Sequence, residues 1–250
     1  MLESYLSNKN SERRRENLRR EIELLQLAGT SSSVTLVELI EIEADRTVII
    51  QDYANGGSLF SIMELRHKRN TTLNEREAQQ IVRSLTSSLN GIYSKGIIHR
   101  DLNVNNVLLH FPSLEPKEHE LQDAKLVERM EMRRKNLVLS DLSQEEFSVK
   151  IADYGLSCRL EKQSLAETPC GTLEVIAPDA LQPGFDHRVD VWGVGVIFYM
   201  LLTLSNVFSS PEELEYGTWS ISTELNYSIE ALRFLNEILQ WSRDFRPFPD

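Results

Sequence analysis

Cysteine is scarce in this sequence, with only Cys158 and Cys170 among 250 residues. They follow neither a metal-ligand spacing nor a disulfide framework, so we expect no zinc cluster and no disulfide-stapled fold. Such scarcity fits a reducing compartment. Long apolar runs are scarce as well. The longest, residues 191–204, is too short to span a bilayer and predicts a buried core helix.

Positive charge is in deficit, because 27 Lys and Arg residues face 38 Asp and Glu residues, which gives a formal net charge of -11. This balance argues against binding to nucleic acid or to an anionic membrane. The arginine-rich stretch at residues 13–20 is therefore interpreted as a solvated helix face. Residues 1–10 contain no apolar core of a signal peptide, so we expect a soluble, intracellular, cytoplasmic protein.

The length suits one large domain or two small lobes that share a cleft. Gly29 is expected to end a first helix, and Asn74 with Glu77 has the form of a capping box that starts a second one. Apolar periodicity predicts helices at residues 11–28, 74–96, 190–204 and 229–240. Runs of β-branched residues predict strands at residues 34–40, 47–51 and 149–152.

Residues 111–147 differ in composition from the rest of the chain. They are rich in Glu, Lys, Arg and Gln and contain two prolines. Leu121, Ala124, Val127 and Met130 have the spacing of one amphipathic helix. We interpret the segment as a surface insertion that is partly helical or disordered.

Four motifs follow one another between residues 97 and 199. They are IIHRDLNVNNVLL at 97–109, VKIADYGLS at 149–157, CGTLEVIAPDAL at 170–181 and DVWGVGVIFY at 190–199. In this order they resemble the signature of the eukaryotic protein kinase superfamily, Ser/Thr type. The resemblance runs from about Leu18 to the end of the chain and excludes the insertion.

The resemblance implies an α+β, two-lobed protein kinase-like fold. Residues 1–54 would form a truncated N-terminal β lobe, a helix and two strands leading to a hinge. Residues 55–250 would form a mainly helical C-terminal lobe. That lobe would hold the catalytic loop, the surface insertion at 111–147 and the activation segment at 153–179.

Phosphoryl transfer needs positioning and charge neutralisation more than covalent chemistry, and ATP-bound magnesium needs oxygen ligands on a rigid frame. By resemblance, Asp101 is the catalytic base, and Asn106 and Asp153 hold Mg²⁺. Each of these residues taken alone is better explained as a turn former, but the set of three is not. Asp190 is expected to be a buried anchor beneath the catalytic loop.

The nucleotide site implied by the resemblance begins at the hinge. Asp52 and Ala54 would offer backbone groups to adenine, and Gln51 would stand at the gatekeeper position. Leu108 would pack beneath the base, or it is an ordinary core residue. Ser58 would face the ribose.

Regulation and substrate docking are also implied. Arg100 would grip a phosphorylated activation loop, and Thr168 would be the phosphosite, or only a threonine in a polar loop. Thr172 would belong to the segment that docks the protein substrate. Asp179 and Arg246 are expected to form a structural ion pair.

Three departures from the family pattern stand out. Residues 1–10 contain neither a Gly-rich loop nor a strand lysine, although Glu21 occupies the place of the glutamate that pairs with such a lysine. Asn103 stands, among the catalytic residues, where Ser/Thr kinases usually carry a lysine that neutralises the transferring phosphate. Tyr154 replaces the phenylalanine of D-F-G.

Two functions are compatible with these motifs. The first is a protein serine/threonine kinase that uses ATP and Mg²⁺ and acts on a protein substrate. A regulatory protein is a possible further partner. In this case the chain is N-terminally incomplete and its own activity is in doubt. The second is a pseudokinase that binds or scaffolds other proteins without transferring phosphate.

Overall fold

The computed structural model describes residues 2–29, 31–43, 46–160, 166, 175–181, 184–208 and 227–247. Within these ranges the α-helices are α1 (Leu2–Ala28), α2 (Leu59–Lys68), α3 (Glu75–Tyr93), α4 (Leu126–Leu139), α5 (Arg188–Thr203) and α7 (Ile229–Ile238). The strands are β1 (Leu36–Glu43), β2 (Arg46–Gln51), β3 (Gly57–Ser58), β4 (Ile97–Ile98), β5 (Val107–His110), β6 (Ser148–Ile151) and β7 (Cys158–Arg159). Short 3-10 turns lie at Pro112–Leu114, Glu118–Glu120, Leu142–Gln144, Pro178–Leu181 and Arg243–Phe245. The α+β class predicted from the sequence is confirmed.

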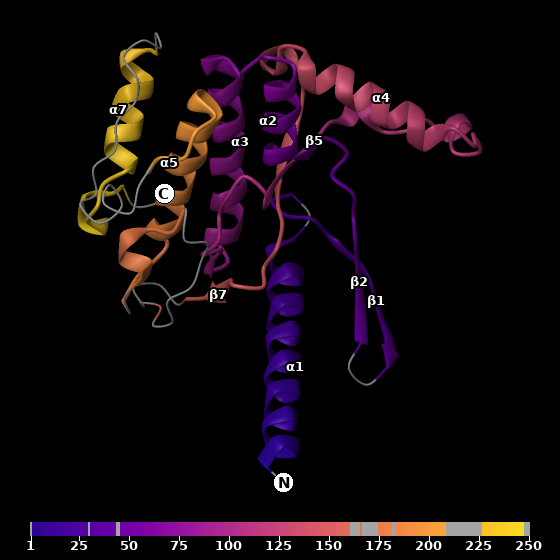
Figure 1. Cartoon of the computed structure of the whole chain (residues 1–250), viewed down its shortest axis with the longest axis vertical. Helices are drawn as coiled ribbons and strands as arrows, with labels where there is room; N and C mark the ends of the chain where they lie inside the picture. The colour runs from indigo at the N-terminus through magenta and orange to yellow at the C-terminus, as the bar shows by residue number, and fades with distance from the viewer. Residues whose placement is uncertain are drawn as a thin grey trace.

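Helix α1 and the β1–β2 hairpin project away from a body that contains α2, α3, α5 and α7 (Figure 1). The helix begins at Leu2 rather than at residue 11, and it ends as predicted at Gly29, whose φ of +80° favours glycine. Its last turns are fixed to the body because Leu24, Leu25 and Ala28 are buried.

The β1–β2 hairpin is antiparallel, with Leu39 opposite Ile49. Its first strand begins at Leu36 and continues to Glu43, so the prediction of residues 34–40 was wrong at both ends. Val34 is buried outside the strand, and its N–H donates to the Ile151 carbonyl at 3.1 Å. The segment before β1 therefore lies beside β6.

Helix α3 is the central helix of the body. Its predicted capping box is present, because the Asn74 side chain accepts from the Glu77 N–H and the Glu77 carboxylate accepts from the Asn74 N–H. Its predicted apolar face is buried, and this face includes Ala78, Ile81, Val82, Leu85, Leu89 and Ile92. The helix packs against α5 and against the sheet β3–β5–β6, whose strands are antiparallel.

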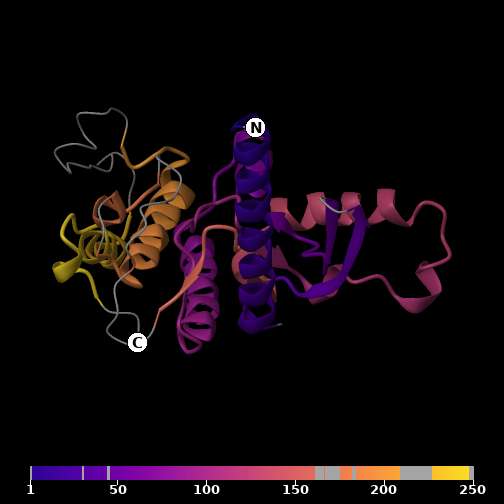
Figure 2. The ribbon, with the colours of Figure 1, turned by 90° about the horizontal axis from the view of Figure 1, so that it is seen from below.

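The insertion at residues 111–147 is more ordered than its composition suggests. Its helix is α4, and both views show α4 reaching out on the same side as the β1–β2 hairpin (Figures 1 and 2). The predicted amphipathic face was wrong, because Leu121 and Ala124 precede the helix and Val127 is 81% exposed. The insertion is fixed to the body instead by buried side chains near its two ends: Phe111, Leu114, Val138 and Leu142.

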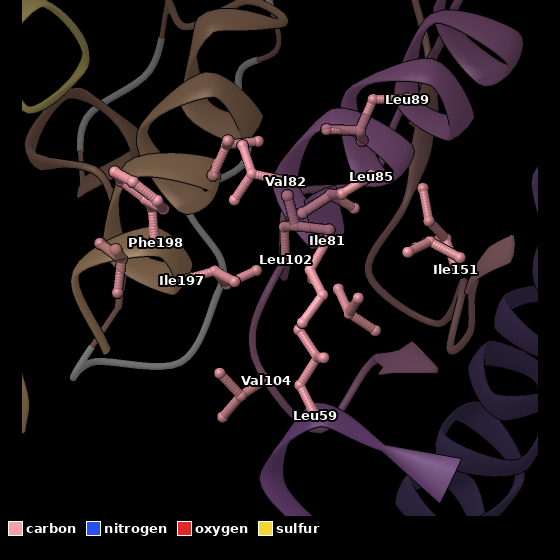
Figure 3. Close-up of a cluster of buried hydrophobic side chains, with 14 of the residues drawn as sticks. Leu59, Ile81, Val82, Leu85, Leu89, Leu102, Val104, Ile151, Ile197 and Phe198 are labelled. Carbon is pink, nitrogen blue, oxygen red and sulfur yellow. The ribbon is translucent and has the colours of Figure 1, made fainter. Parts of the chain in front are cut away.

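The core joins α3 and α5 to the loop between β4 and β5. Figure 3 shows Leu102 of this loop near the side chains of Ile81 and Ile197, and Val104 on the side of Leu59. All of these side chains are buried, so the loop is fixed by its packing against the core. Within the described ranges, no helix has the length and apolar character that crossing a bilayer requires.

Candidate active site

The loop between β4 and β5 is anchored by one buried carboxylate. Asp190, in the first turn of α5, accepts from the His99 N–H at 2.7 Å and from the Arg100 N–H at 2.8 Å. Burial raises the pKa of Asp190, and the two N–H donors and His99 oppose that rise. Arg100 has a φ of +68°, which is unfavourable for a non-glycine residue. Asp190 thus holds a strained turn in place, as predicted for the anchor.

Asp101 and Asn106 belong to this loop and are hydrogen-bonded to each other. The Asn106 amide donates to the Asp101 carbonyl at 2.9 Å and to the Asp101 Oδ2 atom at 3.1 Å. These bonds fix the orientation of the Asp101 carboxylate. They use the NH₂ group of Asn106, so its amide oxygen is still available as an acceptor or a cation ligand.

Asn103 holds the loop from within. Its Nδ2 atom donates to the Asp101 carbonyl at 3.1 Å, and its Oδ1 atom accepts from the Asn105 N–H at 2.9 Å. Both ends of the amide are engaged, and the residue is buried. The sequence placed Asn103 where a lysine would neutralise phosphate, but its side chain is committed to the loop.

Asp153 follows β6 with a φ of +64° and an exposed side chain. Its Oδ1 atom accepts from the Gly155 N–H at 3.1 Å. The next residue, Tyr154, is buried, forms a hydrogen bond with the Ser33 hydroxyl and packs edge-on against His99. The turn thus places one side chain in the core and leaves the carboxylate outside.

Glu21 of α1 lies beside this turn. A Cβ atom at Gly155 would stand 3.1 Å from the Asp153 Oδ1 atom and 3.7 Å from the Glu21 Oε2 atom, so Gly155 sits between two carboxylates. Burial raises the pKa of Glu21, and the charge of Asp153 raises it further. Within the described ranges no lysine or arginine forms an ion pair with either carboxylate.

This arrangement is short of positive charge. An exposed aspartate, a neighbouring half-buried glutamate and a nearby amide oxygen are the hard oxygen ligands that Mg²⁺ prefers. The residue types present therefore fit a magnesium ion. In the described part of the chain, no group of three or more His, Cys, Asp or Glu residues could hold a metal ion by protein side chains alone.

The predicted adenine contacts lie where β2 leaves the hairpin. The Asp52 N–H donates to the Thr35 carbonyl at 2.9 Å, and the Asp52 carboxylate accepts from the Thr35 N–H. The Ala54 carbonyl accepts from the Gly57 N–H at 3.1 Å. These bonds use neither the Asp52 carbonyl nor the Ala54 N–H, so the predicted contact of each residue with adenine has a backbone group for it.

Leu108 and Ser58 are cross-strand partners in the sheet β3–β5–β6. Leu108 is half-buried, whereas its neighbours Val107 and Leu109 face the core. Its side chain therefore lies on the opposite face of the sheet, where the prediction places the base. Ser58 has a second task, because its hydroxyl accepts from the Ser61 N–H at 3.2 Å as the N-cap of α2.

The predicted regulatory residues are only partly described. The Arg100 guanidinium donates to the Leu156 carbonyl at 2.6 Å, just after the Asp153 turn. Thr168 and Thr172 lie outside the described residues. Farther along the chain, Asp179 and Arg246 form the predicted ion pair.

Comparisons with known proteins show which family the chain is similar to. The family profile described as the protein kinase domain matches residues 4–248. A probable myosin light chain kinase of Dictyostelium discoideum is 28% identical over 188 residues, which cover 75% of this chain and 44% of that protein. Serine/threonine-protein kinase ULK1 of Homo sapiens is 28% identical over 212 residues, which cover 84% of this chain and 17% of that protein.

A third relative has a similar sequence identity to this chain. MAP kinase-interacting serine/threonine-protein kinase 2 of Xenopus laevis is 30% identical over 199 residues, which cover 74% of this chain and 35% of that protein. This chain thus spans less than half the length of each of these relatives. Because the family profile covers nearly all of it, the chain belongs to the protein kinase domain family.

Proposed function

We propose that this chain carries the catalytic residues of a Ser/Thr protein kinase, which transfers the γ-phosphate of ATP to a serine or threonine hydroxyl of a protein. The observation that carries the proposal is that the Asn106 amide donates to both the backbone carbonyl and the carboxylate Oδ2 atom of Asp101. These two bonds orient the carboxylate. In this proposal residues 1–54 form the small lobe and hinge, and residues 55–250 form the large lobe.

Each residue then has a task that its contacts support. The Asp101 carboxylate accepts the proton of the attacking hydroxyl, and Asn106 keeps it oriented. Asp153 and the amide oxygen of Asn106 hold magnesium, which would neutralise phosphate charge when bound. Asp52 and Ala54 offer a carbonyl and an N–H to adenine, while Leu108 packs against the ring.

The alternative is a pseudokinase that acts as a scaffold. One observation favours it: where Ser/Thr kinases usually carry a lysine, this chain has Asn103, and its amide is committed to the loop. A kinase site without enough positive charge stabilises the transferring phosphate poorly.

Phosphate transfer from Mg-ATP to mixtures of Ser/Thr peptides and Tyr peptides tests the proposal, with Mg-ATP binding followed in parallel by thermal shift. Wild type, Asp101→Asn and Asp153→Asn are compared, and Asn105→Ala is the matched control because this neighbouring side chain is exposed. We expect Asp101→Asn to bind Mg-ATP normally and to lose about 100- to 10,000-fold in transfer rate. Asp153→Asn should lose both signals, and Asn105→Ala neither.

The outcomes separate the two functions. Transfer to the Ser/Thr peptides that disappears in Asp101→Asn supports the kinase. Ligand at 100 times its Kd stabilises a protein by about 2.7 kcal/mol, so binding without transfer is readily detected. Absence of transfer in wild type favours the scaffold, and transfer that survives in Asp101→Asn refutes the assigned base.

A further inference from the structure

A pocket lies between the insertion and the segment that follows β2, outside the site described above. It has a volume of about 500 Å³. We call it the arm pocket, and its lining consists of Tyr53, Asn55, Leu114, Val127, Met130, Glu131 and Arg134. The last four of these belong to α4, so the pocket exists because the insertion folds back over residues 53–55.

The arm pocket is preformed, because α4 is fastened to the body at its base. Arg66 of α2 donates from Nε to the Val138 carbonyl at 2.7 Å and from Nη2 to the Ser140 carbonyl at 2.6 Å. Nearer the pocket, the Arg134 Nη1 atom donates to the Gly56 carbonyl at 3.3 Å. Because α4 is fixed by the Arg66 bonds and by the Arg134 bond, binding of a ligand costs little conformational entropy in this helix.

The side chains of Asn55, Glu131 and Arg134 in the lining are already paired within the chain. Asn55 donates to the Phe111 carbonyl at 2.9 Å and accepts from the Phe111 N–H at 2.8 Å. Arg134 and Glu131 form two parallel hydrogen bonds of 2.9 Å each. A charged ligand would find no unpaired charge among these groups, so the pocket is electrostatically complementary to an uncharged apolar group.

The apolar walls stand in solvent. Tyr53 is 70% exposed and Val127 is 81% exposed, over a floor that contains the buried Leu114. Exposed apolar surface beside a polar rim is typical of an interaction site. A small molecule would leave such open walls uncovered, whereas binding sites for small molecules usually bury most of the ligand. A peptide covers the walls with the residues that flank its anchor.

We propose that the arm pocket binds a peptide segment of a partner protein by receiving one uncharged aromatic or large aliphatic side chain. Such anchors, buried in a preformed pocket, provide most of the affinity in many protein interfaces. Both views place α4 on the same side of the body as the β1–β2 hairpin and away from α5 and α7 (Figures 1 and 2). The proposal does not depend on phosphate transfer.

The test uses a random dodecapeptide library displayed on phage and selected on the full chain, with counter-selection on Val127→Asp. An enriched peptide is then labelled, and its Kd is measured by fluorescence anisotropy. The matched control is Met132→Asp, because Met132 is on the same helix, is 61% exposed and lies outside the pocket lining. Thermal unfolding of both variants verifies that they are folded.

We expect enriched peptides to share an uncharged aromatic or aliphatic anchor. Val127→Asp should weaken their binding by about tenfold or more, and Met132→Asp should change it by less than about twofold. Peptides that share a charged anchor, or that bind Val127→Asp as well as wild type, would overturn the proposal. So would a failure to enrich any peptide. Sedimentation that shows a wild-type dimer broken by Val127→Asp would replace the peptide by a second copy of the chain.

Discussion

The base of the insertion depends on one buried ion pair, and replacing Arg66 by methionine tests that dependence. The Arg66 Nη2 atom lies 2.6 Å from the Glu77 Oε1 atom, and both side chains are at most 5% exposed. The Arg66 guanidinium also donates to three carbonyls, those of Thr72, Val138 and Ser140. Methionine keeps the apolar stem and removes every one of these bonds.

The expected loss in the free energy of unfolding follows from the Glu77 carboxylate that Arg66→Met leaves buried. In Arg66→Met the Glu77 carboxylate is still buried and accepts only from the Asn74 N–H at 2.7 Å and the Leu142 N–H at 2.8 Å. Breaking a buried pair by removing one partner costs about 3–5 kcal/mol. For a chain of this size each kcal/mol lowers Tm by roughly 2–4 °C, so we expect a decrease of about 6–20 °C.

Urea unfolding and thermal unfolding at neutral pH measure this loss. Arg76→Met is the matched control, because Arg76 is an exposed arginine of α3 next to Glu77, and it should stay within about 0.5 kcal/mol of wild type. Hydrogen exchange at the Leu142 N–H should quicken in Arg66→Met, since that group binds Glu77. A loss below about 1 kcal/mol, the range of exposed ion pairs, would refute the reasoning.

Two further changes test the site itself. Asp190→Ala leaves the N–H groups of His99 and Arg100 without their acceptor, so we expect a loss of about 2–6 kcal/mol in urea unfolding, and a smaller loss in Asp190→Asn, which keeps an acceptor oxygen. An equal loss in both variants would contradict this account. Because the folded state raises the pKa of Glu21 above its ordinary 4.5, ionisation of Glu21 makes wild type lose stability as pH rises from about 4.5 through the raised value. Glu21→Gln should therefore be more stable than wild type at neutral pH, with an advantage that vanishes in unfolding scans below about pH 4.5.

The parts of the fold that the sequence predicted well are those with local signals. The capping box of Asn74 and Glu77 and the apolar face of α3 depend on residues three and four apart, so one stretch of chain contains the whole pattern. The order of the four motifs placed Asp101, Asn106 and Asp153 beside short strands, as the structure has them. Gly29 ended α1 because its backbone geometry suits glycine.

The insertion misled the prediction for a physical reason. Its apolar residues have different environments: Leu114 and Val138 are buried, whereas Leu121 and Val127 are exposed. A single amphipathic face assumes that all apolar side chains point to one core. That assumption fails for an insertion that is fixed to the body near its two ends while Leu121 and Val127 between them stay exposed.

Tertiary partners explain the other misses. Arg66 and Glu77 belong to different helices, and their partners at Val138 and Ser140 lie far along the chain, so no local pattern indicates the pair. Asn103 stands where Ser/Thr kinases usually carry a lysine, and the resemblance did not indicate the local bonds of its amide to Asp101 and Asn105, which give it a task within the loop. The run of asparagines after Asp101 was the available signal, since asparagine readily bonds nearby backbone.

The two carboxylates at Gly155 bear on the choice between kinase and scaffold. Burial and the charge of Asp153 both oppose ionisation of Glu21, so this arrangement makes the folded chain less stable than a neutral residue at position 21 would. Features that break local stability rules are expected mainly at functional sites. A bound cation between or beside the carboxylates would relieve the repulsion, which couples the fold to a ligand. A scaffold gains nothing from such an acidic pair, and we therefore rank the magnesium-dependent reaction ahead of the scaffold.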